Sequence, residues 1–145
     1  MEFSHPAPFD GRTCETDHGP KPYIANVRNA AAQNRNFRTA FWTGRHLQMT
    51  LMSIPPNGNI GVEMHPDTDQ FIRVEVGTAL IRMGLQKDRL DSQHLLHAGD
   101  ALFVPAGTWH NVVNRSHVPL KLSSIYAPPQ HPKCTIHRTK ADAAE

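Results

Sequence analysis

The sequence has few residues that would form crosslinks, membrane spans or large aromatic clusters. Its 145 residues include two cysteines, Cys14 and Cys134, and aromatic residues make up 7% of the chain. Two cysteines near opposite ends do not form a disulfide framework, so we expect reduced thiols and a cytoplasmic protein. No apolar run approaches the roughly 18 residues of a membrane span, and the N-terminal residues lack the basic-then-apolar pattern of a secretory signal. We therefore expect no membrane partner.

Charge and common catalytic motifs are also sparse. The 15 basic and 13 acidic residues leave a net charge of +2, which predicts no nucleic-acid partner. The chain has no Gly-x-Ser-x-Gly motif, no cysteine beside a histidine on a predicted strand and no Gly-rich phosphate loop. No cluster of Lys and Arg surrounds the motifs described below to hold a phosphate. The length allows one domain with a modest core.

The chain does contain many short apolar segments separated by glycine and proline. Residues 1–22, with four prolines, predict a flexible N-terminal arm, and residues 23–145 predict one domain. We expect a short strand at 23–27, one or two helical turns at 29–34 and a short helix or an outer wrap near 140–144. Further strands are predicted at 37–42, 46–54, 60–65, 70–76, 79–83, 92–96, 101–104, 109–114 and 120–126. This spacing is typical of an all-β sandwich or barrel.

Two stretches carry the candidate site. In the first, Glu63 and His65 lie two residues apart and therefore share a strand face, while Gln70 lies on the returning strand. The second runs from Gly99 to Asn114 and contains Pro-x-Gly-x-x-His, a turn that delivers His110 to the start of a strand. We predict that Glu63, His65, Gln70 and His110 point into one cavity.

The second stretch, Gly-x5-Pro-x-Gly-x2-His-x3-Asn, matches the second motif of the cupin family at every position. The first resembles the first cupin motif, with Glu63 where a His is usual, His65 in the place of the second His and Gln70 where a Glu is usual. The resemblance covers about residues 45–127 and implies a double-stranded β-helix, or jelly roll. It also implies one divalent metal ion per chain, bound by Glu63, His65, Gln70 and His110. These donors suit Zn, Fe, Mn, Co or Ni.

The two departures from the motif compensate each other. The carboxylate moves from position 70 to position 63, so the charge of the ligand set is kept. A buried Glu63 without a cation would cost several kcal/mol. The alternative is a metal-free barrel in which His65 and His110 are hydrogen-bonded interior residues. Asp67 and Asp69 are rival ligands, which we expect to lie in a solvated turn instead.

Three functions remain open for such a site. Glu63 and Tyr126 are the candidate catalytic groups, although Tyr126 could instead pack at the barrel rim. A phosphomannose isomerase of the cupin superfamily has a similar set of ligands, which favours a small metal-dependent enzyme acting on a sugar-like or small hydroxy-carbonyl compound. Two His and one carboxylate also suit an Fe(II)-dependent dioxygenase, and a non-catalytic metal-stabilised binding module is the third reading. We also expect a small-molecule ligand and a homodimer, because sheet edges need protection.

Overall fold

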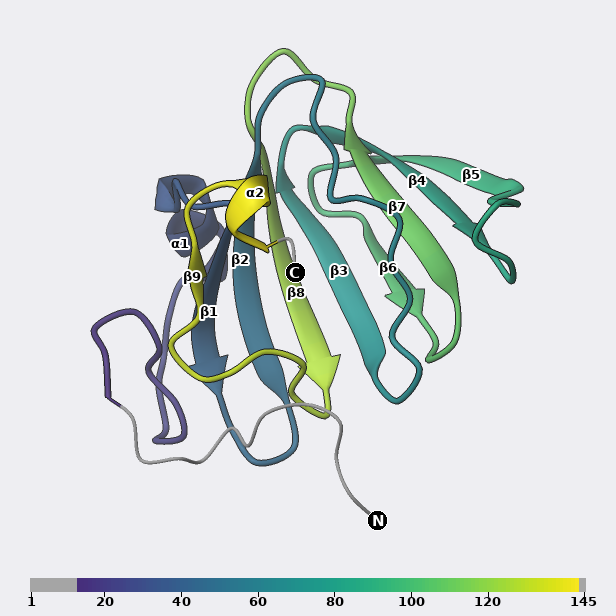
Figure 1. The fold of residues 1–145 in the computed structure, drawn as a ribbon. Coiled ribbons are helices and arrows are strands. Elements are labelled where there is room, and N and C mark those ends of the chain that lie inside the picture. Colours follow the sequence, from purple (N-terminus) through teal and green to yellow (C-terminus); the bar gives the residue numbers. More distant parts are fainter. Residues whose placement is uncertain (1–12, 144–145) are drawn as a thin grey trace.

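The computed structural model describes residues 13–143, which form two antiparallel sheets packed face to face (Figure 1). A six-stranded sheet has the order β6-β3-β8-β2-β1-β9 and a three-stranded sheet has the order β5-β4-β7. The elements are α1 (Val27–Gln33), β1 (Arg38–Thr43), β2 (Gln48–Ile54), β3 (Asp69–Val76), β4 (Thr78–Gly84), β5 (Ser92–His97), β6 (Ala101–Val104), β7 (Trp109–Asn114), β8 (Leu120–Ala127), β9 (Ile136–His137) and α2 (Lys140–Ala143). No helix among residues 13–143 is long and apolar enough to cross a membrane.

The predicted jelly roll is confirmed, and two predicted strands differ from the structure. β6 and β7 have the predicted bounds. The strand expected at 23–27 is absent because the chain there enters α1, whose first turn is capped by a hydrogen bond from the Asn29 amide to Asn26 Oδ1. The strand expected at 60–65 is reduced to isolated bridges with β7, one of which pairs Glu63 with His110.

The interior of the six-stranded sheet is apolar at one end. β2 and β8 pair antiparallel, with Met52 opposite Leu122 and Ile54 opposite Leu120, and all four side chains are buried. Alternate residues of a strand share a face, so these even-numbered positions point inward together. They form the core with buried residues of the neighbouring strands, including Ile72, Val74, Ile81, Leu102 and Val112.

The other end of the same interior is polar. Further along β2 and β8, the register places Thr50 opposite Ser124 and Gln48 opposite Tyr126, again at even-numbered positions. Gln70 of β3 lies opposite Tyr126, and all five residues are buried. The inward face therefore changes from apolar to polar partway along each strand. Because buried polar groups need partners, this end of the barrel is where a ligand site is expected.

The terminal segments pack against β1. A disulfide joins Cys14 to Cys134 across 120 residues of chain, so the interpretation of these cysteines as reduced thiols is wrong. Buried Asp17 accepts hydrogen bonds from the Gly19 amide, from the amide and hydroxyl of Thr43 and from the Cys134 amide. The described part of the expected arm, residues 13–22, therefore lies against the barrel, and residues 1–12 lie outside the described part of the chain.

Candidate metal centre

Backbone hydrogen bonds bring the two motif stretches together. The Glu63 amide donates to the His110 carbonyl over 2.9 Å, and the His110 amide donates back to Glu63 over 2.8 Å. Two residues on, the Gly107 amide donates to the His65 carbonyl over 2.9 Å. The chain from Glu63 to His65 thus runs beside the start of β7, and this pairing sets Glu63 next to His110.

The turn before β7 requires glycine at its third position. Gly107 has a φ of +87°, a backbone conformation that costs other L-residues energy. The turn is closed by the Thr108 amide, which donates to the Pro105 carbonyl over 3.2 Å. Asp69 Oδ1 accepts from the Ala106 amide over 2.9 Å and fixes the turn to the start of β3. Asp69 therefore serves the turn, and it and Asp67 are exposed as predicted.

Three predicted ligands converge at the end of this pairing. Ligand atoms of Glu63, His65 and His110 all lie within 4.8 Å of one another. Glu63 Oε1 lies 3.5 Å from His65 Nε2 and 4.0 Å from His110 Nε2. Two atoms bound to one ion at about 2.1 Å lie at most about 4.2 Å apart, so the two separations from Glu63 Oε1 fit a shared cation. Both Nε2 atoms are buried without a hydrogen-bond partner among the described residues, so both positions are available to an ion.

The protonation of His110 suits a ligand. Its Nδ1 lies 3.0 Å from the Thr108 carbonyl oxygen, and a carbonyl can only accept, so Nδ1 carries the proton and Nε2 faces Glu63. Burial lowers the pKa of His110 below its ordinary value, against the opposing effects of the Thr108 carbonyl and the Glu63 charge. A neutral imidazole oriented through its other nitrogen is the usual form of a metal ligand.

Glu63 is held in its charged form. Burial alone would raise the pKa of its carboxyl, but the neighbouring His65 imidazole and the Arg38 guanidinium outweigh that effect and lower the pKa. Arg38 Nη2 lies 3.8 Å from Glu63 Oε2. The site therefore contains a carboxylate with a cationic neighbour and two imidazoles, a donor set that suits a borderline divalent metal.

Gln70 and Tyr126 lie deeper in the polar end of the barrel. Gln70 is buried on β3, and its Oε1 has no hydrogen-bond partner; its role as fourth ligand stays a prediction. Tyr126 is fully buried rather than at the rim. Its ring lies 5.6 Å from the His65 ring and 5.2 Å from the His131 ring, both edge to face. Burial raises the pKa of Tyr126, so the phenol keeps its proton.

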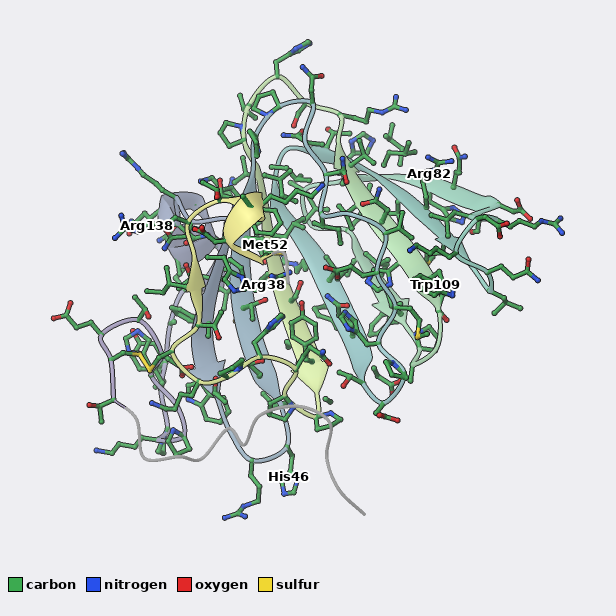
Figure 2. All side chains as sticks on the ribbon, viewed as in Figure 1. Arg38, His46, Met52, Arg82, Trp109 and Arg138 are labelled. Carbon is green, nitrogen blue, oxygen red and sulfur yellow. A yellow bond between two sulfur atoms is a disulfide. The ribbon has the colours of Figure 1, made fainter. Side chains whose placement is uncertain are left out.

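Sequence reasoning missed a group of nitrogen-bearing side chains that share a cavity with Glu63. The cavity has a volume of about 420 Å³, and its polar lining includes Arg38, Glu63, His131, His137 and Lys140. Arg38 and Lys140 are the Lys and Arg side chains of this lining among the described residues, and the sequence motifs did not indicate either of them. Figure 2 shows Arg38 near the middle of the molecule, whereas Arg82 and Arg138 lie at its outside.

The missed residues come from both ends of the chain. Arg38 occupies an inward-facing position on β1, opposite buried Met52. Its strand parity is the sequence signal that could have identified it as a cavity residue. The segment that follows β8 crosses in front of β1 and β2 before it reaches α2 (Figure 1), and it supplies His131, His137 and Lys140. No pattern in the sequence indicated this return.

Comparison with known proteins places this chain in one family. The family model for the Cupin domain matches residues 50–126, which is more than half of the chain. The uncharacterized protein YrkC of Bacillus subtilis is 54% identical over 127 residues, or 88% of this chain and 68% of its own length. The uncharacterized protein L612 of Acanthamoeba polyphaga mimivirus is 43% identical over 111 residues, or 76% of this chain and 68% of its own length.

Solved structures give the same result. The crystal structure of BH2720 from Bacillus halodurans superposes with a TM-score of 0.87 at 54% identity and covers 89% of this chain and 98% of that one. TT1209 from Thermus thermophilus superposes with a TM-score of 0.61 at 25% identity, and the match covers 72% of this chain and 96% of TT1209. A cupin sugar phosphate isomerase from Silicibacter pomeroyi, at 21% identity and a TM-score of 0.50, covers 59% and 53% and shares the fold alone.

Proposed function

Because this chain belongs to the cupin family, we propose that it binds one divalent metal ion and is a small metal-dependent enzyme. Its substrate would be a sugar-like or small hydroxy-carbonyl compound, and the reaction an isomerisation. The observation that carries the proposal is the convergence of Glu63, His65 and His110 within 4.8 Å, with both imidazole Nε2 atoms buried and unpartnered. A metal-free barrel would leave those atoms unsatisfied, at a cost of about 1–3 kcal/mol each.

When bound, the ion supplies Lewis-acid polarisation of a substrate carbonyl or hydroxyl oxygen. The protein residues would bind the substrate and move its protons. Tyr126 is a neutral phenol beside His65, so it can donate a hydrogen bond or a proton to a substrate oxygen. Glu63 is an anionic carboxylate and can serve as ligand or as proton acceptor. An isomerisation needs no oxidant, since a proton leaves one carbon and returns to its neighbour.

The polar end of the barrel supports a small polar ligand. Buried atoms without a hydrogen-bond partner in this region include Thr50 Oγ1, Gln70 Oε1, Ser124 Oγ and His131 Nε2. Unsatisfied buried polar atoms are rare in native proteins unless water, an ion or a ligand serves them. Their concentration around Glu63 and Tyr126 favours a hydroxylated ligand over an apolar one.

The first test measures metal binding. Purified protein would be stripped with a chelator, dialysed against Zn(II), Mn(II), Fe(II), Co(II) or Ni(II), and its metal content measured by elemental analysis. We expect one ion per chain in the wild type and none in a His65→Ala plus His110→Ala variant. His94→Ala is the matched control, because His94 is exposed on β5. Equal, stoichiometric metal in the wild type and in the double variant would contradict the site.

A second function is favoured by the same donor set. Two histidines and one carboxylate also suit Fe(II) with open positions for oxygen and substrate. Loaded protein would be screened against aldoses, ketoses and hydroxy acids, with and without oxygen. Isomer formation with Zn(II) under nitrogen supports the isomerase, whereas oxygen uptake only with Fe(II) supports a dioxygenase. No turnover under either condition would favour a metal-stabilised binding module.

A further inference from the structure

The cavity that opens on Glu63 contains a buried arginine whose charge is poorly compensated. Arg38 is 3% exposed, and its Nε is buried without a hydrogen-bond partner. Its Nη1 lies 3.1 Å from His137 Nδ1, and its Nη2 lies 3.8 Å from Glu63 Oε2. A guanidinium cannot lose its proton in a protein, so the positive charge is permanent.

The neighbouring imidazoles do not supply the missing anion. A guanidinium only donates hydrogen bonds, so the Arg38 contact makes His137 Nδ1 an acceptor. His131 lines the same cavity with an unpartnered Nε2. Lys140 lies at the exposed end of the cavity, where its Nζ donates to Asn59 Oδ1 over 3.1 Å. The groups facing Arg38 from β9 and the segment before it are thus neutral or basic.

Metal binding would increase this imbalance. Glu63 is the carboxylate within ion-pair distance of Arg38 and is also a metal ligand in the proposed function. A divalent ion, the Glu63 carboxylate and the Arg38 guanidinium together carry a charge of about +2, in a region where an unpaired charge is costly. An anionic ligand in the cavity would offset that charge.

We propose that Arg38 binds a carboxylate of the substrate, which makes that substrate a small 2-hydroxy or 2-oxo acid. The proposal rests on the proposed function for the metal, and it adds the chemical class of the substrate. The planar guanidinium matches a carboxylate in geometry and forms strong charge-assisted hydrogen bonds with it. Arg38 is the one fully buried cation of the cavity lining among the described residues. A single deep cation suits a carboxylate better than a phosphate dianion, which carries more charge and more acceptor oxygens.

The test compares three probes on the Zn(II)-loaded protein by isothermal titration calorimetry. The probes are lactate, its neutral analogue lactamide, and inorganic phosphate. We expect lactate to bind at least about tenfold more tightly than lactamide, because a charge-assisted hydrogen bond contributes more than about 1.4 kcal/mol, and phosphate to bind more weakly than lactate. Lactamide binding as tightly as lactate, or phosphate binding more tightly, would overturn the proposal. This comparison uses the wild type alone and does not depend on any variant folding.

Variants then test Arg38 itself. Arg38→Gln and Arg38→Lys should each weaken lactate binding by about tenfold or more, because Lys keeps the charge but loses the planar fork. Arg82→Gln is the matched control, since Arg82 is an exposed arginine on β4. Circular dichroism would confirm that each variant is folded. Wild-type lactate affinity in a folded Arg38→Gln protein would overturn the assignment.

Metal content separates this inference from the proposed function. Arg38→Gln removes a positive charge beside Glu63, so it should bind at least as much zinc as the wild type. If the wild type binds no metal, the proposed metal enzyme fails, and the lactate and lactamide titrations are repeated on the metal-free protein. Arg38-dependent lactate binding there would still support the carboxylate site, and its absence would overturn it.

Discussion

At the scale of single residues, burial controls the chemistry of the site. His131 shows this most clearly, because burial and then the neighbouring Arg38 charge lower its pKa to about 2. An unfolded histidine has a pKa of about 6.5. At a pH between these two pKa values, His131 is protonated in the unfolded chain and neutral in the folded chain. Stability must therefore fall as the pH drops below about 6.5.

This difference predicts the pH dependence of stability. From pH 7 to pH 5, His131 alone should reduce the free energy of unfolding by about 2 kcal/mol. His131→Gln should remove that part of the pH dependence, as measured by urea denaturation of chelator-treated protein at several pH values. His94→Gln, at an exposed position on β5, should leave it unchanged. Identical pH profiles for His131→Gln and the wild type would mean that His131 does not titrate in this way.

A second prediction concerns Gln70, the proposed fourth ligand. Its buried Oε1 has no hydrogen-bond partner, and loss of a neutral amide donor should weaken a metal site less than loss of its carboxylate. We expect Gln70→Ala to raise the Kd for Zn(II) by about tenfold and Glu63→Ala to raise it much further. Competition with a fluorescent zinc chelator would measure both. Asp67→Ala is the control at an exposed position, and an unchanged Kd for Gln70→Ala would exclude Gln70 as a ligand.

At the scale of elements, Asp17 connects segments that are distant in sequence. Its carboxylate accepts from Thr43 at the end of β1 and from the Cys134 amide beside the disulfide. Cys134 lies between His131 and His137, the two histidines that the C-terminal segment supplies to the cavity. Asp17 therefore stabilises the part of the chain that covers the candidate site.

Loss of this carboxylate should be strongly destabilising. Asp17→Ala leaves the buried amides of Gly19 and Thr43 without an acceptor, and each unsatisfied group costs about 1–3 kcal/mol. We expect the free energy of unfolding to fall by about 2–4 kcal/mol in chemical denaturation. Glu15→Ala, at an exposed position in the same segment, should change it by less than about 0.5 kcal/mol. Equal effects of the two substitutions would contradict this role.

At the scale of the whole molecule, one end of the outer face of the six-stranded sheet is apolar, whereas Arg73 and Lys121 lie toward its other end. Ile24 is 97% exposed and Phe103 is 75% exposed. Two grooves on this face, of about 290 and 490 Å³, both include Ile125 in their lining, and Asp69 is the one charged residue that lines them among residues 13–143. Exposed apolar patches of this kind mark interaction sites. We propose that a second copy of this chain covers these two apolar grooves in a two-fold dimer, because a two-fold axis packs the same patch of each copy against its equivalent.

Light scattering on the purified protein tests the dimer. The wild type at micromolar concentration should have twice the chain mass of 16.2 kDa, and Ile24→Glu combined with Phe103→Glu should give the monomer mass. Leu95→Glu is the control, because Leu95 is a half-exposed apolar residue on β5 of the other sheet. A wild-type monomer, or a dimer that survives the double substitution, would contradict this interface.

The sequence by itself determined most of the strands, the motif residues and the family. Glu63, His65 and His110 could be identified because the motif spacing and the turn at Gly107 are local properties of the sequence. The bounds of β6 and β7 followed from the apolar runs between glycine and proline. The prediction of a strand at 60–65 was wrong because the conformation of this segment depends on how it pairs with β7. Sequence patterns do not reveal that pairing.

Only the tertiary structure decided what surrounds those ligands. Arg38 and His131 come from segments that are distant in sequence, and their approach to Glu63 depends on sheet order and on the path of the chain after β8. The Cys14–Cys134 disulfide joins residues 120 positions apart, and sequence separation gives no distance in space. The periodicity of a sequence indicates which face of a strand is buried. Which side chains then meet in the interior depends on long-range packing. In this chain, that packing places the positive charge of Arg38 beside the candidate metal ligands.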